Sequence, residues 1–294
     1  MLSHNLIRQK FNLRARRLAA IEFIYQEVAT RMVSRLDYIK LNPARILDLG
    51  SGLNIDANLL AAKYPKTVLY QLDFALNVLQ LSNLQSSWKK FIQHILAKYQ
   101  SSLKICADAI NLPIAANSID ILWSNLMLPY INDVELLFKE IRRVLAVGGC
   151  FLISGLGVDS LKELREIGLN TYNFPDMHLI GDLLVKLGFT NPVMDMEYIT
   201  LEYDDFNLLL QDIRLLGIGS ACSLQPQDLT RVEYNNLADK FAKTTKNGKI
   251  PLTLEVFYAH AWKDKIHLDL PIGKQVIQFH PNKKIILGAN HYVK

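Results

Sequence analysis

Polar residues that suit a nucleoside cofactor follow four short hydrophobic runs of this 294-residue chain. The runs lead into "DLGSGLN", an isolated acid, "DAINLP" and "SN". Glycines let the backbone approach a ligand closely, and an acid beyond a glycine loop binds ribose hydroxyls in dinucleotide sites. The candidate cofactor-binding residues are Asp48, Gly50, Gly52, Asn54, Asp73, Asp108, Ala109 and Asn125.

Each of these signals also has a purely structural interpretation. Two glycines are typical of a tight turn, and an acid after a strand often caps the next helix. Together, however, all four fall where strands are expected to end, and open α/β sheets bind ligands at that edge. The loop has Asn54 in place of the last glycine of a pyrophosphate fingerprint. S-adenosylmethionine (SAM), which has no phosphates, therefore fits better.

Hydrophobic periodicity predicts the elements that position these residues. Strands are expected at 44–50, 67–73, 103–108, 119–126, 149–156, 192–203 and 252–262. Helical segments are expected at 6–38, 55–63, 75–99, 133–145, 176–187, 205–217 and 226–245. The alternation predicts an α/β fold with a doubly wound, mostly parallel seven-stranded sheet.

The chain is expected to form one domain, residues 1–294, with four parts. N-terminal helices occupy 1–42, and the core sheet takes 43–200 and 250–262. The segment 204–248, which lies between two strands, is predicted to be an inserted helical lid. Residues 263–294 form a C-terminal tail with short strand-like pieces.

Composition narrows the class of protein. Hydrophobic residues make up 50% and charged residues 21%, which predicts a sizeable core rather than disorder. No stretch has the length and apolarity of a membrane span. The three cysteines and seven histidines show no metal-ligand spacing, so no metal site is expected. Unpaired, scattered cysteines favour the cytoplasm.

The N-terminal segment concentrates positive charge in a chain whose net charge is +5. Its basic residues are Arg8, Lys10, Arg14, Arg16 and Arg17, all before the first acid, Glu22. A solvated helix face, a landing patch for an acidic protein and a mitochondrial targeting segment all fit this pattern. The targeting interpretation is disfavoured because the helical pattern continues through Met32 without a break.

Longer motifs resemble a known family. They include "EFIYQEVATRMVSRLDYIKLNPARILDLGSG", "WSNLMLPYINDVELLFKEIRRVLAVGGCFLIS", "DSLKELR", "LLLQDIRLLGIGSA" and "LTLEVFYAHAWK". The chain resembles the class I SAM-dependent methyltransferases and, among them, the malonyl-[acyl-carrier protein] O-methyltransferases of biotin synthesis. The resemblance covers roughly residues 5–265.

This resemblance implies SAM as the cofactor and a malonyl group on an acidic acyl-carrier protein as the substrate, with neither nucleic acid nor membrane as a partner. The methyl acceptor is the free carboxylate. Arginine suits that group because its fork matches two oxygens. The candidate catalytic residues are Arg165 after the fifth strand, Arg214 on the lid, and Tyr130, which stands near the position of a family tryptophan.

Two departures from the family pattern keep other functions open. Ser51 and Asn54 alter the glycine loop, and Pro129 precedes Tyr130. The alternatives are a hydroxylase-like assembly factor that acts on a protein, and a SAM-binding partner protein without catalysis. Asn tolerates a positive φ better than other non-glycine residues, so the turn at Asn54 is expected to survive.

Overall fold

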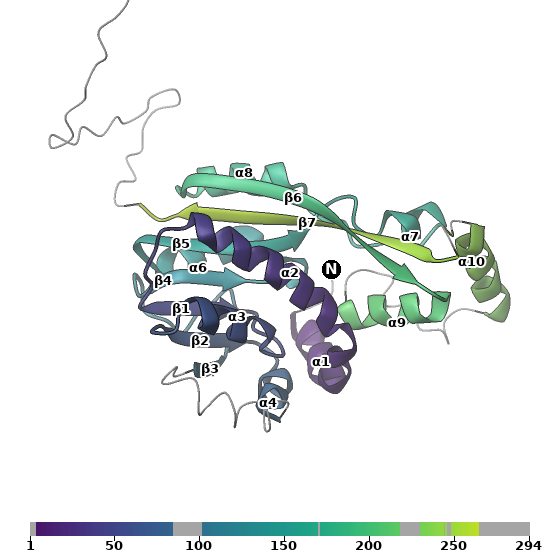
Figure 1. Ribbon diagram of the computed structural model, residues 1–294, viewed down its shortest axis with the longest axis horizontal. Helices are drawn as coiled ribbons and strands as arrows, with labels where there is room; N and C mark the ends of the chain where they lie inside the picture. Colours follow the sequence, from purple (N-terminus) through teal and green to yellow (C-terminus); the bar gives the residue numbers. More distant parts are fainter. Residues whose placement is uncertain are drawn as a thin grey trace, which may run out of the picture.

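The computed structural model describes residues 4–84, 102–169, 171–217, 230–243, 245 and 248–264 (Figure 1). Its strands are β1 (Arg45–Leu49), β2 (Val68–Asp73), β3 (Ser102–Cys106), β4 (Ile119–Ser124), β5 (Leu145–Leu156), β6 (Thr190–Tyr203) and β7 (Ile250–Trp262). Its helices are α1 (His4–Arg14), α2 (Glu22–Arg35), α3 (Ile55–Lys63), α4 (Leu76–Leu84), α6 (Val134–Val144), α7 (Lys162–Glu166), α8 (Met177–Lys186), α9 (Phe206–Leu216) and α10 (Arg231–Lys243). Short 3₁₀ helices are η1 (Ala15–Ile21), η2 (Leu36–Tyr38) and η3 (Leu128–Tyr130).

The strands form one seven-stranded sheet in the order β3-β2-β1-β4-β5-β7-β6. Strands β1 to β5 pair in parallel, and β7 runs antiparallel to both β5 and β6. The predicted mostly parallel, seven-stranded sheet is therefore confirmed. Strand order reverses between β1 and β4, and ligands bind beside such a switch point at the carboxyl ends of the strands.

Helices cover both faces of the sheet, and alternate strand residues pack against each layer. On β4, Trp123 belongs to the core beneath α2, α3 and η1, whereas its neighbour Leu122 belongs to the core beneath α6 and α8. Phe151 and Leu152 divide in the same way on β5. This period-two burial on both faces explains why the strands read as nearly continuous apolar runs.

The N-terminal segment contains a break that periodicity did not predict. The expected single helical stretch over 6–38 is divided by η1 between α1 and α2. The buried residues of η1 are Ala15, Leu18 and Ile21, which recur every third position. Side chains at that spacing lie above one another in a 3₁₀ helix, so one narrow apolar edge packs inward.

The segment between β6 and β7 contains α9 and α10, which lie near one end of the long β6–β7 pair (Figure 1). The two helices pack through Phe206, whose ring centroid lies 4.9 Å from that of Phe241. Asp205 begins α9 by accepting a hydrogen bond from the amide of Leu208. Residues 218–229 of the predicted lid lie outside the described residues.

Several predicted boundaries shift. Strand β5 begins at Leu145 rather than at 149, and β3 ends at Cys106 rather than at Asp108. The predicted helix over 75–99 is described to Leu84, and its remainder and the tail beyond 264 lie outside the described residues. Within the described part of the chain, no helix is long and apolar enough to cross a membrane.

Candidate functional site

A cleft of about 870 Å³, its open mouth included, lies at the carboxyl ends of β1, β2 and β4. Ligand pockets of a few hundred to about 1,000 Å³ are the usual size for small molecules. Seven of the predicted site residues line it: Gly50, Gly52, Asp73, Asp108, Ala109, Asn125 and Tyr130. Asp48, Asn54, Arg165 and Arg214 are not part of the lining.

The loop after β1 forms the floor of the cleft. Gly50 and Gly52 have φ angles of +76° and +52°. A Cβ at Gly50 would lie 2.9 Å from the side chain of Met127 on the opposite wall. The amides of Gly50 and Ser51 both donate to the carbonyl of Leu72, which fixes the loop against β2. Glycine is therefore required at position 50 by both backbone angle and space.

Asn54 occupies the left-handed region, with φ of 70° and ψ of 32°, directly before α3. The turn thus keeps the backbone conformation that a glycine would adopt there. Although Asn54 was a candidate cofactor-binding residue, it does not line the cleft. Its Oδ1 is buried and finds no hydrogen-bond partner among the described residues.

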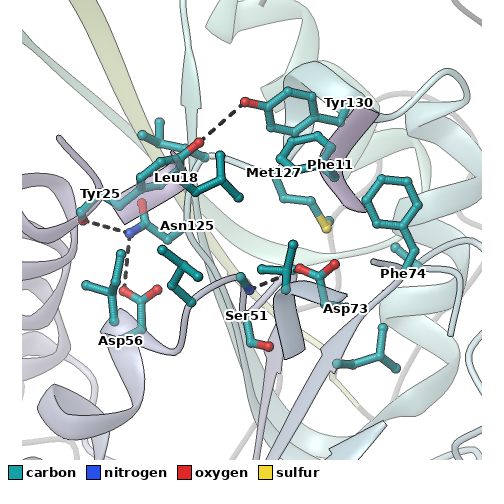
Figure 2. A pocket seen from close by; sticks show the side chains of 18 of the residues that line it. Phe11, Leu18, Tyr25, Ser51, Asp56, Asp73, Phe74, Asn125, Met127 and Tyr130 are labelled. Carbon is teal, nitrogen blue, oxygen red and sulfur yellow. Dashed lines mark hydrogen bonds between the residues drawn. The ribbon is translucent and has the colours of Figure 1, made fainter. Parts of the chain in front are cut away.

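Asp73 ends β2 and is held rigidly beside the floor loop (Figure 2). One carboxylate oxygen accepts from the amide of Gly52 at 3.0 Å, and the other accepts from that of Ala75 at 2.8 Å. The side chain is buried, and burial raises the pKa of Asp73 to about 6 against the lowering effect of these amides. Its remaining lone pairs are available to ligand hydroxyls in the cleft.

Two further buried acids belong to the same region: Asp56 lines the cleft, and Asp48 does not. Burial raises the pKa of Asp56 to about 7, although Asn125 donates a hydrogen bond to it at 3.2 Å. Burial raises the pKa of Asp48 well above its ordinary value, and the charges of Asp56 and Asp73 raise it further. Neither oxygen of Asp48 has a hydrogen-bond partner within the described residues. Such a cluster of acids favours a cationic ligand.

Asn125 connects three parts of the cleft (Figure 2). Its amide nitrogen donates to the carbonyl of Tyr25 at 2.9 Å as well as to Asp56, and its oxygen accepts from Ser154 at 3.0 Å. These bonds join the end of β4 to α2, α3 and β5. The third predicted acid, Asp108, accepts the amide of Ile110 at 3.1 Å in the turn after β3.

Aromatic residues cover the cleft, and sequence reasoning missed most of them. Phe11 of α1 packs edge-on against Tyr130, with ring centroids 4.8 Å apart, and lies 5.8 Å from Phe74 (Figure 2). Tyr25 of α2 also lines the cleft and brings its hydroxyl to 3.5 Å from that of Tyr130. The sequence did contain a signal for them, namely the aromatic residues of the N-terminal helices. These helices lie over the edge of the sheet in the folded chain.

The two predicted arginines lie elsewhere. Arg165 on α7 lines a separate cavity that shares no residue with the cleft. Its guanidinium donates to the carbonyls of Val158 and Ser160 and to the hydroxyl of Thr171. The structure therefore does not bring Arg165 to the cleft as expected. Arg214 contributes its backbone carbonyl, rather than its guanidinium, to a contact with the N-terminal segment.

The residues of the cleft fit SAM. The buried carboxyl group of Asp48 has no hydrogen-bond partner among the described residues, and Gly50 and Gly52 let a ligand approach the backbone closely; both features suit a cationic ligand. Asp73 is placed to accept ribose hydroxyls. Apolar side chains, including Phe74 and Val78, offer a surface for an adenine ring.

Comparison with known proteins also indicates a methyltransferase. Residues 47–153 match the family model of the methyltransferase domain. A malonyl-[acyl-carrier protein] O-methyltransferase from Gallionella capsiferriformans is 42% identical over 270 residues, covering 90% of this chain and 92% of that protein. One from Methylovorus sp. is 36% identical over 282 residues and covers 94% of each chain.

Among solved structures, a phosphoethanolamine N-methyltransferase 2 from Haemonchus contortus, in complex with phosphomonomethylethanolamine and S-adenosylhomocysteine (SAH), superposes with a TM-score of 0.50. It is 18% identical, and the match covers 80% of this chain and 53% of that one, which supports the fold alone.

Fold and cleft together define a class I SAM-dependent methyltransferase. Within that class the chain belongs to the malonyl-[acyl-carrier protein] O-methyltransferase family, as its curated relatives show. Its cofactor is SAM. These relatives do not favour the assembly-factor alternative.

Proposed function

We propose that this chain transfers the methyl group of SAM to the free carboxylate of a malonyl thioester on acyl-carrier protein, in the cytoplasm, as a step of biotin synthesis. The observation that carries the proposal is a 42% identity to a malonyl-[acyl-carrier protein] O-methyltransferase over nine-tenths of both chains. The cleft supports it, because acids and glycines that suit SAM lie together at one sheet edge.

Methyl transfer to a carboxylate needs few catalytic side chains. A carboxylate is already ionised at neutral pH, so no general base is needed. When bound, SAM supplies a methyl group activated by a sulfonium charge. The protein contributes orientation of the two groups and exclusion of water. Exclusion helps because opposite charges disappear as the methyl group transfers, and a medium of low polarity favours that change.

Residues on the walls would perform these tasks. Asp73 would hold the ribose, and the buried carboxylate of Asp48 would favour the positive charge of the methionine portion. Phe11, Leu18 and Tyr130 would cover the reacting groups and limit access of water. The segment 204–248 would act as a lid, since the hydroxyl of Tyr130 donates to the carbonyl of Leu216 at the end of α9.

Carrier approach would use the basic N-terminal segment. Arg16 and Arg17 are exposed on η1, next to a helix that lies over the cleft. An acidic carrier would be steered toward this face by long-range attraction. That would bring the malonyl group to the end of the cleft that the N-terminal helices cover.

A steady-state assay of SAH release tests the proposal. The enzyme should release SAH with malonyl-carrier and SAM but not with acetyl-carrier, which has no free carboxylate to accept the methyl group. SAH release from neither carrier, by a protein that binds SAM in calorimetry, would favour the partner-protein alternative instead.

A further inference from the structure

Arg14 lies beside Tyr130, a residue that lines the cleft, at the end of α9. It is the last residue of α1, three positions after Phe11 and four before Leu18, and both of these line the cleft. Phe11 and Arg14, three residues apart on α1, share one helix face. The guanidinium Nη1 donates to the carbonyl of Arg214 at 2.6 Å. A Cβ built on Gly217 would lie 3.5 Å from this same nitrogen and 3.6 Å from the ring of Tyr130.

Arg14 and Tyr130 thus flank the end of α9, where helix carbonyls carry partial negative charge. Arg14 donates to one terminal carbonyl, and Tyr130 donates to that of Leu216. A carboxylate is a stronger acceptor than a carbonyl and matches the arginine fork with two oxygens. A substrate carboxylate could therefore compete with the carbonyls of Arg214 and Leu216 for these two donors.

Arg14 differs from three of the partly buried arginines in its contacts. Arg31, Arg35 and Arg143 each form an ion pair with a carboxylate. In the described part of the chain, no carboxylate forms an ion pair with Arg14. A partly buried guanidinium that has no carboxylate partner among the described residues, and that lies beside a residue lining the cleft, is suited to an anionic ligand.

The cleft creates a need for such a cation. Asp56 and Asp73 line the cleft, and in their ionised forms they would repel an anionic substrate. Arg165 is bonded within its own loop and opens on a different cavity, so it does not answer this need. Arg14 does, because it shares a face of α1 with Phe11, which lines the cleft, and lies beside Tyr130.

We propose that Arg14 binds the free carboxylate of the acyl substrate, exchanging the Arg214 carbonyl for the carboxylate, with the Tyr130 hydroxyl as a second donor. The inference rests on the proposed function, because it assigns the residue that recognises the malonyl group. It replaces Arg165 as the carboxylate anchor and makes α1 a part of the substrate site.

The test measures recognition of the carboxylate apart from turnover. The full-length protein is saturated with SAH, and calorimetry compares the binding of malonyl-pantetheine with that of its methyl ester. Wild type should prefer the free acid. Arg14→Ala should weaken binding of the acid about 10- to 100-fold, the range for a lost hydrogen bond to a charged group, and should abolish the preference. SAH affinity should stay within about twofold of wild type, which also shows that the variant folds.

Two substitutions separate recognition from support of α9. Gln at position 14 can still donate to the Arg214 carbonyl but has no charge, whereas Lys keeps the charge without the fork. Arg14→Gln should therefore behave like Arg14→Ala, and Arg14→Lys should restore part of the preference. Rescue by Gln but not by Lys would show a structural role and overturn the inference.

Further variants decide between rival arginines. Arg45→Ala removes an exposed arginine where β1 begins, at the end of the sheet opposite the cleft, and should leave the preference intact. Loss of the preference in Arg165→Ala with retention in Arg14→Ala would overturn the inference while keeping the proposed function. A wild type that neither binds nor methylates the free acid would overturn both.

Discussion

At the scale of single residues, the site depends on carboxylates whose surroundings disfavour their charge. Asp73 is the clearest case, because two amides fix its orientation while burial raises its pKa to about 6. A cofactor that offers hydroxyls and a positive charge would complete its hydrogen bonds. Affinity for SAM should therefore depend more on this residue than on any single apolar contact.

We expect Asp73→Ala to weaken SAM binding by about 1.5–3 kcal/mol, because buried ribose hydroxyls would lose a charged partner. Titration calorimetry measures the change. The matched control is Asp182→Ala, which removes an exposed acid on α8 and should bind SAM as wild type does. Unchanged affinity in Asp73→Ala would contradict the assignment.

Asn54 provides a second test, this time of the backbone. Since Asn54 occupies a positive φ of 70°, Asn54→Gly should preserve or improve SAM binding. Asn54→Val should instead lower the free energy of unfolding by about 1–2 kcal/mol, because a branched side chain is strained there. Denaturant unfolding and calorimetry measure the two effects. A sharp drop in affinity in Asn54→Gly would mean that the amide itself contacts the ligand.

At the scale of elements, the sequence predicted the strand ends well and the covering helices poorly. Acids and glycines at strand ends could be found because the carboxyl ends of parallel strands meet at one edge. Phe11 and Tyr25 could not, because they reach the cleft only when the N-terminal segment folds over that edge. The 3₁₀ helix at Ala15–Ile21, which directs Leu18 inward, gives no distinct signal in the 3.6-residue pattern.

Arg165 shows the opposite error, in which a residue in the expected element points elsewhere. It follows β5, as the sequence predicted, but Leu161 takes a φ of 61° and turns the chain into α7. That turn directs Arg165 to the carbonyls of Val158 and Ser160. The direction of a side chain after a strand depends on turn geometry, which an isolated leucine at positive φ does not reveal.

The junction of α3 with β4 predicts a pH dependence. Burial raises the folded-state pKa of Asp56 to about 7, so its contribution favours the folded state below about pH 4 and is lost as pH rises through 7. Asp56→Asn removes the ionisable group, so the free energy of unfolding of the ligand-free protein should fall less between about pH 5 and 7.5 than in wild type. The hydrogen bond from Asn125 can be kept, because the oxygen of the new amide can accept it. Thermal unfolding of both proteins across that range, about pH 5 to 7.5, measures the difference. Identical slopes would show that Asp56 is not buried as an ionisable acid.

Binding should show the reverse trend. A cationic ligand favours ionised acids, so the affinity for SAM should increase from about pH 5.5 to 7.5 as Asp73 and Asp56 lose protons. SAH lacks the sulfonium charge, and its affinity should change less over the same range. Calorimetry with both ligands makes the comparison, and equal slopes would contradict a role of the acids in recognising the positive charge.

At the scale of the whole molecule, a sheet edge binds the cofactor while a basic N-terminal segment covers it. This division predicts a salt effect on the carrier substrate alone. The kcat/KM for malonyl-carrier should fall as ionic strength rises and the screening length shortens to about 8–10 Å, whereas kcat/KM for malonyl-pantetheine should change little. Arg17→Ala should lower the slope for the carrier. Equal salt dependence for both substrates would place the carrier away from this segment.

The intact mass of malonyl-loaded carrier protein, after incubation with the enzyme and SAM, tests the central claim most directly. The account predicts that the carrier gains the mass of one methylene group, that fragmentation places it on the malonyl group, and that acetyl-loaded carrier is unchanged. A malonyl-carrier of unchanged mass, recovered from an enzyme that calorimetry shows to bind SAM, would contradict the account.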